Sequence, residues 1–152
     1  MIRDEILAKR YERIWLQLQD LFQETGNKIS RMAAATALLH HKMPHFSWTG
    51  FYVLTGEELL VGPYQGTLAC LSLEKNQGVC WAAIRRQTTI LVPDVRQFPG
   101  HIACDSRSKS EVAVPLSGPD GKVWAVLDVD SRRLGAFSEV DREWLEKIAS
   151  LI

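Results

Sequence analysis

The chain has 152 residues, of which 46% are hydrophobic and 24% charged, and its formal net charge is zero. This length predicts one domain, spanning residues 1–152, with enough apolar side chains to bury a core. Because acidic and basic residues balance, nothing indicates binding to nucleic acid or to an anionic membrane. No apolar run could span a bilayer and the charged amino terminus does not resemble a signal peptide, so we expect a cytoplasmic protein.

The first half of the chain predicts two helices followed by strands. Residues 4–24 carry apolar side chains at helical spacing with charges on the other face, and residues 29–41 are rich in alanine and leucine. Residues 48–54 and 59–64 are rich in aromatic, branched and other apolar residues, which predicts a hairpin. The short apolar run 68–73 predicts another strand.

The second half predicts a short helix, three strands and a final helix. Residues 79–86 follow a glycine and predict the helix, and residues 90–92 predict a short strand. A second hairpin is predicted from residues 111–116 and 123–130, and the last helix is expected to begin at Ser138. The order of elements predicts an α+β fold, with a mainly antiparallel central sheet flanked by amino-terminal and carboxy-terminal helices.

A cysteine in a polar loop is the first candidate for chemistry. Cys104 follows a Pro99-Gly100 turn and precedes Asp105 and other polar residues, and loops of this composition lie at the surface and often carry function. The other cysteines, Cys70 and Cys80, lie beside glycines at the edges of predicted elements. Thiols that meet in the fold would support exchange chemistry. In a reducing compartment a disulfide is more often transient and catalytic than structural.

Each cysteine also has a simpler interpretation. Free cysteine commonly behaves as a small buried hydrophobe, and for Cys70 and Cys80 this alternative stays open. A zinc site made from the cysteines and His101 is disfavoured, because the cysteines are ten (70 to 80) and twenty-four (80 to 104) positions apart. The predicted helix amino terminus near Cys80 is expected to lower the pKa of its thiol.

Acidic residues on the second hairpin are the other candidate feature. Asp128 and Asp130 alternate along a strand, so their side chains point to the same face of the sheet. Glu111 begins the partner strand, so the hairpin can bring all three acids together. Such carboxylates repel one another, which raises at least one pKa unless a cation lies among them. They would bind an ammonium group or supply a general acid; the alternative is a strand end that emerges into solvent.

At this point the sequence resembles the free methionine-(R)-sulfoxide reductases, which are stand-alone GAF domains. The resemblance runs from about Met32 to the carboxyl terminus. It rests on the following segments: Phe46-Ser47-Trp48-Thr49-Gly50-Phe51-Tyr52, Gly62-Pro63-Tyr64-Gln65-Gly66, Ala69-Cys70, Gly78-Val79-Cys80, Gly100-His101-Ile102-Ala103-Cys104-Asp105, Ser110-Glu111, Val114-Pro115-Leu116 and Val126-Leu127-Asp128-Val129-Asp130-Ser131.

The resemblance implies a GAF-like fold and a role for each candidate residue. Cys104 matches the nucleophile that becomes a sulfenic acid, while Cys70 and Cys80 match recycling positions, and which of them resolves stays open. Glu111, Asp128 and Asp130 match the acids that hold the substrate ammonium and assist protonation. Trp48 and Tyr52 match the aromatic residues that line the pocket.

The resemblance also implies partners. Free methionine-(R)-sulfoxide would be the substrate, and a thioredoxin-type protein would be the electron donor. The protein would bind no cofactor and no metal, and a homodimer is one assembly that it could form. Three positions depart from the family. Trp81 stands where glycine is usual and would narrow the pocket or shield Cys80, while Arg107 and Lys109 replace small or polar residues between Cys104 and Glu111, where they would help hold Cys104 as a thiolate or face solvent. The alternative function is a GAF module that binds a small ligand or senses redox state without turnover.

Overall fold

A six-stranded sheet forms the centre of the molecule in the computed structural model, which describes residues 1–101 and 104–152. Its strands are β1 (Trp48–Thr55), β2 (Glu58–Gln65), β3 (Ser72–Leu73), β4 (Ile90–Val92), β5 (Ser110–Ser117) and β6 (Val123–Ser131). Neighbouring strands are antiparallel, in the order β3-β2-β1-β6-β5-β4. The expected mainly antiparallel sheet is confirmed. Ile102 and Ala103, which belong to the predicted cysteine loop, lie outside the described residues.

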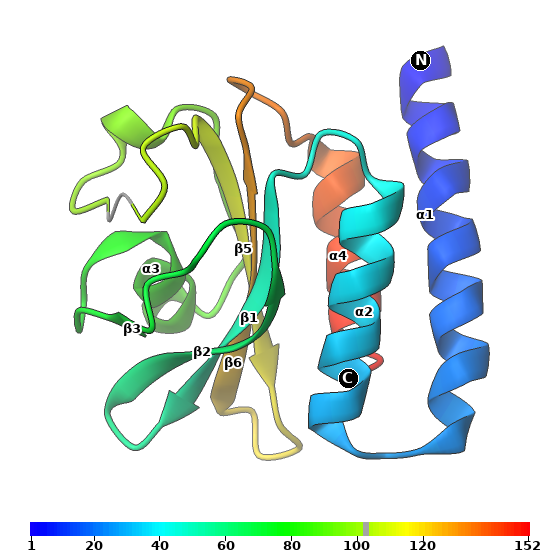
Figure 1. The fold of residues 1–152 in the computed structure, drawn as a ribbon, viewed down its shortest axis with the longest axis horizontal. Coiled ribbons are helices and arrows are strands. Elements are labelled where there is room, and N and C mark those ends of the chain that lie inside the picture. The colour runs from blue at the N-terminus through cyan, green and yellow to red at the C-terminus, as the bar shows by residue number, and fades with distance from the viewer. Residues whose placement is uncertain (102–103) are drawn as a thin grey trace.

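Helices cover both faces of this sheet (Figure 1). They are α1 (Ile2–Leu21), α2 (Lys28–Lys42), α3 (Gly78–Arg86) and α4 (Glu139–Ala149), with short 3-10 turns at Phe22–Glu24 and Val95–Gln97. The amino-terminal helices and α4 lie on one face, where Tyr11, Leu39, Leu145 and other apolar side chains form a core with the sheet. α3 lies on the opposite face and forms a second core. None of the helices in the described part of the chain is long and apolar enough to cross a bilayer.

A buried aspartate joins the terminal helices. The Asp141 carboxylate accepts hydrogen bonds from the Tyr11 hydroxyl at 2.6 Å and from the Ser138 backbone N–H at 2.8 Å. The second contact belongs to the predicted capping box, and α4 begins directly after Ser138. The predicted start of the last helix is therefore confirmed, and the same carboxylate fixes α4 against α1.

The prediction of a strand over residues 68–73 is largely wrong. Only Ser72–Leu73 forms a strand, while Leu68 and Leu71 are 86% and 73% exposed. The apolar residues of this run predict a strand, but most of the segment forms a surface loop instead of a strand of the sheet. The region before Leu73 is thus a loop that carries Cys70, and this loop borders the candidate site.

Alternation along β6 separates the core from the site. Leu127 and Val129 belong to the core with the terminal helices, whereas Val126 belongs to the core on the α3 face. Because side chains alternate along a strand, Asp128 and Asp130 lie on the α3 face. The sheet therefore presents its acids to the side of the molecule that also carries the cysteines.

Candidate active site

The three predicted acids converge on one patch of the sheet. In the β5–β6 pairing Glu111 lies directly opposite Asp130, and Asp128 pairs with Ala113, two residues along. Glu111 and Asp128 are only 6% and 5% exposed, and Asp130 is partly exposed. Cross-strand neighbours on one face are close enough for their side chains to interact. The hairpin thus assembles the cluster that the spacing predicts.

Burial raises the pKa of all three carboxyl groups, and repulsion between charges adds to this effect for Glu111 and Asp130. Burial, followed by the charges of Asp128 and Asp130, raises the pKa of Glu111 well above its usual value. Burial also raises the pKa of Asp128, and burial with the nearby Asp128 charge raises that of Asp130. Oδ1 of Asp128 is buried without a hydrogen-bond partner among the described residues. A cation or a proton would relieve both the repulsion and the missing contact.

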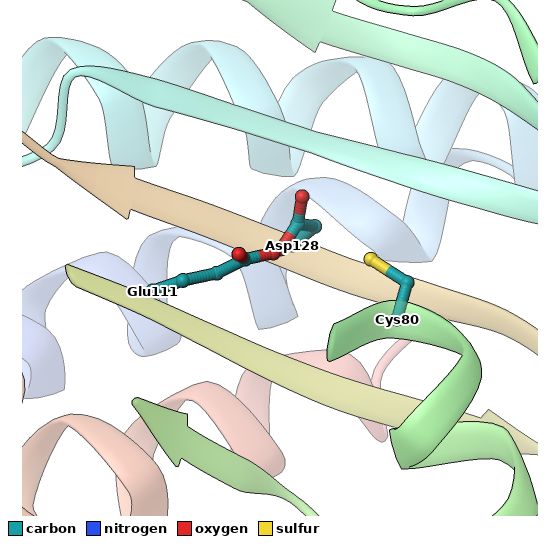
Figure 2. Close-up of side chains that lie close together, drawn as sticks. All are labelled: Cys80, Glu111 and Asp128. Carbon is teal, nitrogen blue, oxygen red and sulfur yellow. The ribbon is translucent and has the colours of Figure 1, made fainter. Parts of the chain in front are cut away.

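Cys80 joins this cluster from α3 (Figure 2). Its sulfur and one oxygen each of Glu111 and Asp128 all lie within 4.8 Å of one another. The expected lowering of the Cys80 pKa is wrong: burial and the charges of Asp128 and Glu111 raise the pKa of this thiol well above its usual value. The helix terminus cannot compensate for an environment that is both buried and negative.

The other cysteines form a disulfide at the rim. Cys70 and Cys104 are joined, with their Cα atoms 5.6 Å apart, and Cys80 is a free buried thiol. Cys104 is exposed and Cys70 partly buried, so both lie where a partner protein can reach them more easily than Cys80. Cys104 and Cys80 line the same pocket. The expectation that thiols meet in the fold therefore holds for the Cys70–Cys104 pair.

An aromatic wall closes another side of the pocket. Trp48 stacks against Tyr52, with ring centroids 5.8 Å apart, and against Tyr64, at 5.4 Å. Gly50, between Trp48 and Tyr52 on β1, makes room for this arrangement, because a Cβ there would clash with the Tyr64 Cβ. Tyr64 was not predicted as a site residue; its pairing with Gly50 across the strands is the signal that could have found it.

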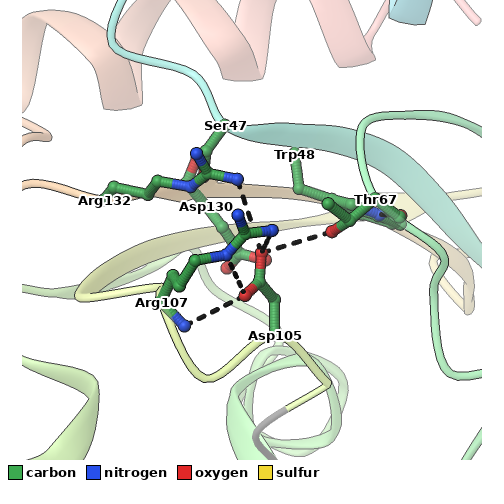
Figure 3. Close-up of polar contacts among 7 residues, drawn as sticks. All are labelled: Ser47, Trp48, Thr67, Asp105, Arg107, Asp130 and Arg132. Atoms are coloured by element: carbon green, nitrogen blue, oxygen red, sulfur yellow. Dashed lines mark hydrogen bonds and ion pairs between the residues drawn. The ribbon is translucent and has the colours of Figure 1, made fainter.

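Polar contacts connect the wall and the cysteine loops (Figure 3). The Trp48 indole N–H donates to the Thr67 carbonyl at 3.1 Å, and the Thr67 hydroxyl donates to the Asp105 carboxylate at 3.2 Å. Asp105 also accepts from the Arg107 backbone N–H at 3.0 Å, which holds the pKa of this carboxyl below its usual value. The sequence did not single out Thr67, because its role depends on a contact between distant segments.

Of the two cations expected to act on Cys104, Arg107 is opposed by Asp105 and Lys109 faces solvent. The Arg107 guanidinium donates to Asp105 at 3.2 Å and is more than half exposed, and Lys109 is exposed as well. Trp81 is buried in the α3 core and its indole N–H donates to the Leu73 carbonyl at 3.2 Å. This substitution for glycine therefore fixes β3 against α3 instead of filling the space between the acids.

His101 lines the pocket, although sequence reasoning considered it only for a disfavoured zinc site. Its Nδ1 lies 3.8 Å from a Glu111 oxygen, and burial lowers the pKa of the ring. Burial therefore makes the His101 ring a poorer source of positive charge for Glu111. Two of the three thiols of the disfavoured zinc site form the Cys70–Cys104 disulfide in this structure. Donor atoms that could contact a cation together come from Cys80, Glu111 and Asp128.

Comparison with known proteins gives consistent matches over most of the chain. A family model described as GAF domain matches residues 17–152. GAF domain-containing protein A of Dictyostelium discoideum is 42% identical, covering 95% of this chain and 90% of that protein. A free methionine-R-sulfoxide reductase of Saccharomyces cerevisiae is 38% identical, covering 99% and 85%. The solved free methionine-R-sulfoxide reductase of Neisseria meningitidis, in complex with its substrate, superimposes with a TM-score of 0.90 at 35% identity, covering 95% of this chain and 86% of that one.

Proposed function

This chain belongs to the GAF domain family and to the free methionine-(R)-sulfoxide reductases within it, and we propose that Cys104 and Cys70 carry out the reaction. The protein is an oxidoreductase that reduces free methionine-(R)-sulfoxide to methionine. The observation that carries the proposed mechanism is the Cys70–Cys104 disulfide at the rim of a pocket lined by Glu111, Asp128 and Asp130. It joins two thiols beside a site that suits a cationic substrate group.

The first step is attack by the Cys104 thiolate on the sulfoxide sulfur. Methionine leaves with the electron pair of its reduced sulfur, and the oxygen remains on Cys104 as a sulfenic acid. The sulfoxide oxygen needs a proton in this step, and a carboxyl group with a raised pKa can hold one at neutral pH. Glu111 and Asp130 meet that requirement, since burial raises the pKa of both.

The second step is attack by the Cys70 thiol on the sulfenic sulfur. A disulfide forms and water leaves, so one sulfoxide and two thiols yield one sulfide, one disulfide and one water. A thioredoxin-type dithiol then reduces the Cys70–Cys104 bond by exchange, and the exposed position of Cys104 favours access. Cys80 lies outside this bond, so we place it as the second recycling position after Cys70, next to the acids.

The acids and the aromatic wall select the substrate. The α-ammonium group of free methionine sulfoxide lies among Glu111, Asp128 and Asp130, where it gives the buried Asp128 oxygen a partner. Trp48 and Tyr52 pack against the methyl group on the sulfoxide sulfur and orient the sulfoxide toward Cys104. The reaction uses no bound cofactor, and we place the enzyme in the cytoplasm, as one domain that can form a homodimer.

A redox sensor that uses the same cysteines without turnover is the alternative, and the exposed, disulfide-bonded Cys104 is the observation in its favour. A coupled assay distinguishes the two functions. Reduced protein is mixed with free methionine-(R)-sulfoxide, thioredoxin, thioredoxin reductase and NADPH, and the loss of NADPH absorbance is followed. We expect sustained oxidation with wild type and none with Cys104→Ser. A disulfide that forms with hydrogen peroxide, but no methionine release from the sulfoxide, would favour the sensor. A fully active Cys104→Ser would transfer the nucleophile to Cys80.

A further inference from the structure

The loop that carries Cys70 is fixed mainly by polar contacts. Two of its large apolar side chains, Leu68 and Leu71, point to solvent, so apolar packing contributes little. Aromatic residues of β1 hold its backbone instead: the Trp48 indole N–H donates to the Thr67 carbonyl at 3.1 Å, and the Tyr52 hydroxyl donates to the Cys70 carbonyl at 3.1 Å. The sheet thereby fixes the position of one reacting sulfur.

The loop that carries Cys104 connects to the first loop through Asp105. This carboxylate is 15% exposed and accepts from the Arg107 backbone N–H and guanidinium, while Arg132 lies 4.0 Å away. Its Oδ2 also accepts from the Thr67 hydroxyl at 3.2 Å (Figure 3). Asp105, adjacent to Cys104, is thus hydrogen-bonded to Thr67, three positions before Cys70.

We propose that the Thr67–Asp105 hydrogen bond positions the two loops for disulfide formation, so that both residues are positioning residues for the second step. The inference rests on the proposed function for the assignment of that step. The Cys70 thiol must reach the Cys104 sulfenic sulfur, form the S–S bond and release water. Two loops separated by 34 residues meet productively only when a contact keeps their ends together.

The first step does not need this contact. Thr67 and Asp105 line the pocket, but the groups proposed to contact the substrate in the first step are Cys104, the acids and the aromatic wall, whereas the hydrogen bond joins the Cys104 loop to the Cys70 loop. Losing the bond should therefore slow disulfide formation without slowing methionine release. A purely structural role for Thr67 would slow both steps together, and this difference makes the proposal testable.

The experiment is a rapid-quench single turnover of reduced full-length protein. Thr67→Val removes the hydroxyl but keeps the shape of the side chain. Methionine release reports the first step, dimedone labelling reports the Cys104 sulfenic acid, and mass analysis reports the disulfide. Thr89→Val is the matched control, because the buried Thr89 hydroxyl donates to the Glu146 carboxylate at 2.6 Å, between α4 and the turn before β4, outside the pocket.

We expect Thr67→Val to release methionine at the wild-type rate and to form the disulfide roughly tenfold more slowly, with more dimedone adduct. Thr67→Ser should restore the rate, and Thr89→Val should match wild type. Adding Thr67→Val to Asp105→Ala should slow disulfide formation no further, because the bond is already lost. A wild-type disulfide rate in Thr67→Val, or an equal slowing of methionine release, would overturn the proposal.

A second arm replaces the substrate with stoichiometric hydrogen peroxide, which oxidises the Cys104 thiolate to the same sulfenic acid. Disulfide formation should again be roughly tenfold slower in Thr67→Val. If wild type released no methionine from the sulfoxide, the proposed function would fail, while this arm would still decide the role of the hydrogen bond. Equal peroxide rates in wild type and variant would refute the positioning role alone.

Discussion

The acid cluster predicts strong discrimination between free methionine-(R)-sulfoxide and its N-acetyl derivative. Acetylation converts the ammonium group into a neutral amide and leaves the rest of the substrate unchanged. Glu111 and Asp128, which are only 6% and 5% exposed, then lack the ammonium group as a partner. Oδ1 of Asp128 also keeps no hydrogen-bond partner among the described residues. The kcat/KM for the acetylated substrate should therefore fall steeply.

The magnitude follows from the cost of an unpaired buried charge. Removing one partner of a buried ion pair costs about 3–5 kcal/mol. Asp130 is partly exposed and a raised pKa lets Glu111 hold a proton, so the lower end of that range, about 3 kcal/mol, applies. Since about 1.4 kcal/mol is a factor of ten in rate, kcat/KM should differ by roughly a hundredfold.

The assay compares kcat/KM for the two substrates with wild type, Asp128→Asn and the control Asp20→Asn, which alters an exposed carboxylate on α1. Asp128→Asn should lower the rate with the free amino acid by roughly tenfold or more and leave the acetylated substrate little changed, so selectivity falls. Asp20→Asn should keep the wild-type ratio. Comparable kcat/KM for both substrates with wild type would show that the carboxylates do not contact the amino group.

Four other outcomes are expected. Cys70→Ser should release methionine once and then stop, with a Cys104 sulfenic acid detectable by dimedone; repeated turnover would exclude Cys70 as the resolving thiol. Reducing the disulfide should lower the free energy of unfolding by about 3.8 kcal/mol, because the bond closes a loop of 34 residues, and thermal melts with and without dithiothreitol measure this; unchanged melting would contradict it. Glu111→Gln should inactivate the enzyme but raise its melting temperature by a few degrees at pH 8. The sign follows from the raised pKa of Glu111: the folded state retains a proton that the unfolded state loses above its usual pKa of 4.5, so wild-type stability falls as pH rises and the gain should vanish near pH 4. Gly50→Ala should destabilise the fold by about 1–3 kcal/mol in urea titrations and raise KM, since its Cβ would lie 2.7 Å from the Trp48 ring; unaltered stability would refute the tight contact.

The sequence predicts this fold well where local patterns decide the structure. Alternation along residues 123–130 placed Asp128 and Asp130 on one face, and the hairpin register then brought Glu111 beside them. The prediction failed at residues 68–73, because an apolar run does not reveal whether neighbouring elements will cover it. It failed again for the Cys80 pKa, where the carboxylates that surround the thiol come from β5 and β6.

Contacts between distant loops were beyond the reach of sequence patterns. No periodicity relates Thr67 to Asp105, and the partner of Cys104 could not be chosen between Cys70 and Cys80 from spacing alone. The resemblance named the residues, but their pairing depends on how the loop before β3 crosses the end of the sheet. Three-dimensional proximity of loops is set by the whole fold, so it appears only once the fold is known.

Alternation along β6 lets one strand serve stability and chemistry at once. Leu127 and Val129 are fully buried against the terminal helices, and that apolar burial stabilises the domain. The residues between and beyond them carry charge into the opposite face, where repulsion with Glu111 is unfavourable until a cation arrives. Because neighbouring side chains point to opposite faces, the helix side can offset the cost of the acids without contacting the substrate. In the proposed mechanism, binding of an ammonium group relieves that repulsion, so the feature that destabilises the empty site would supply affinity and selectivity for the free amino acid.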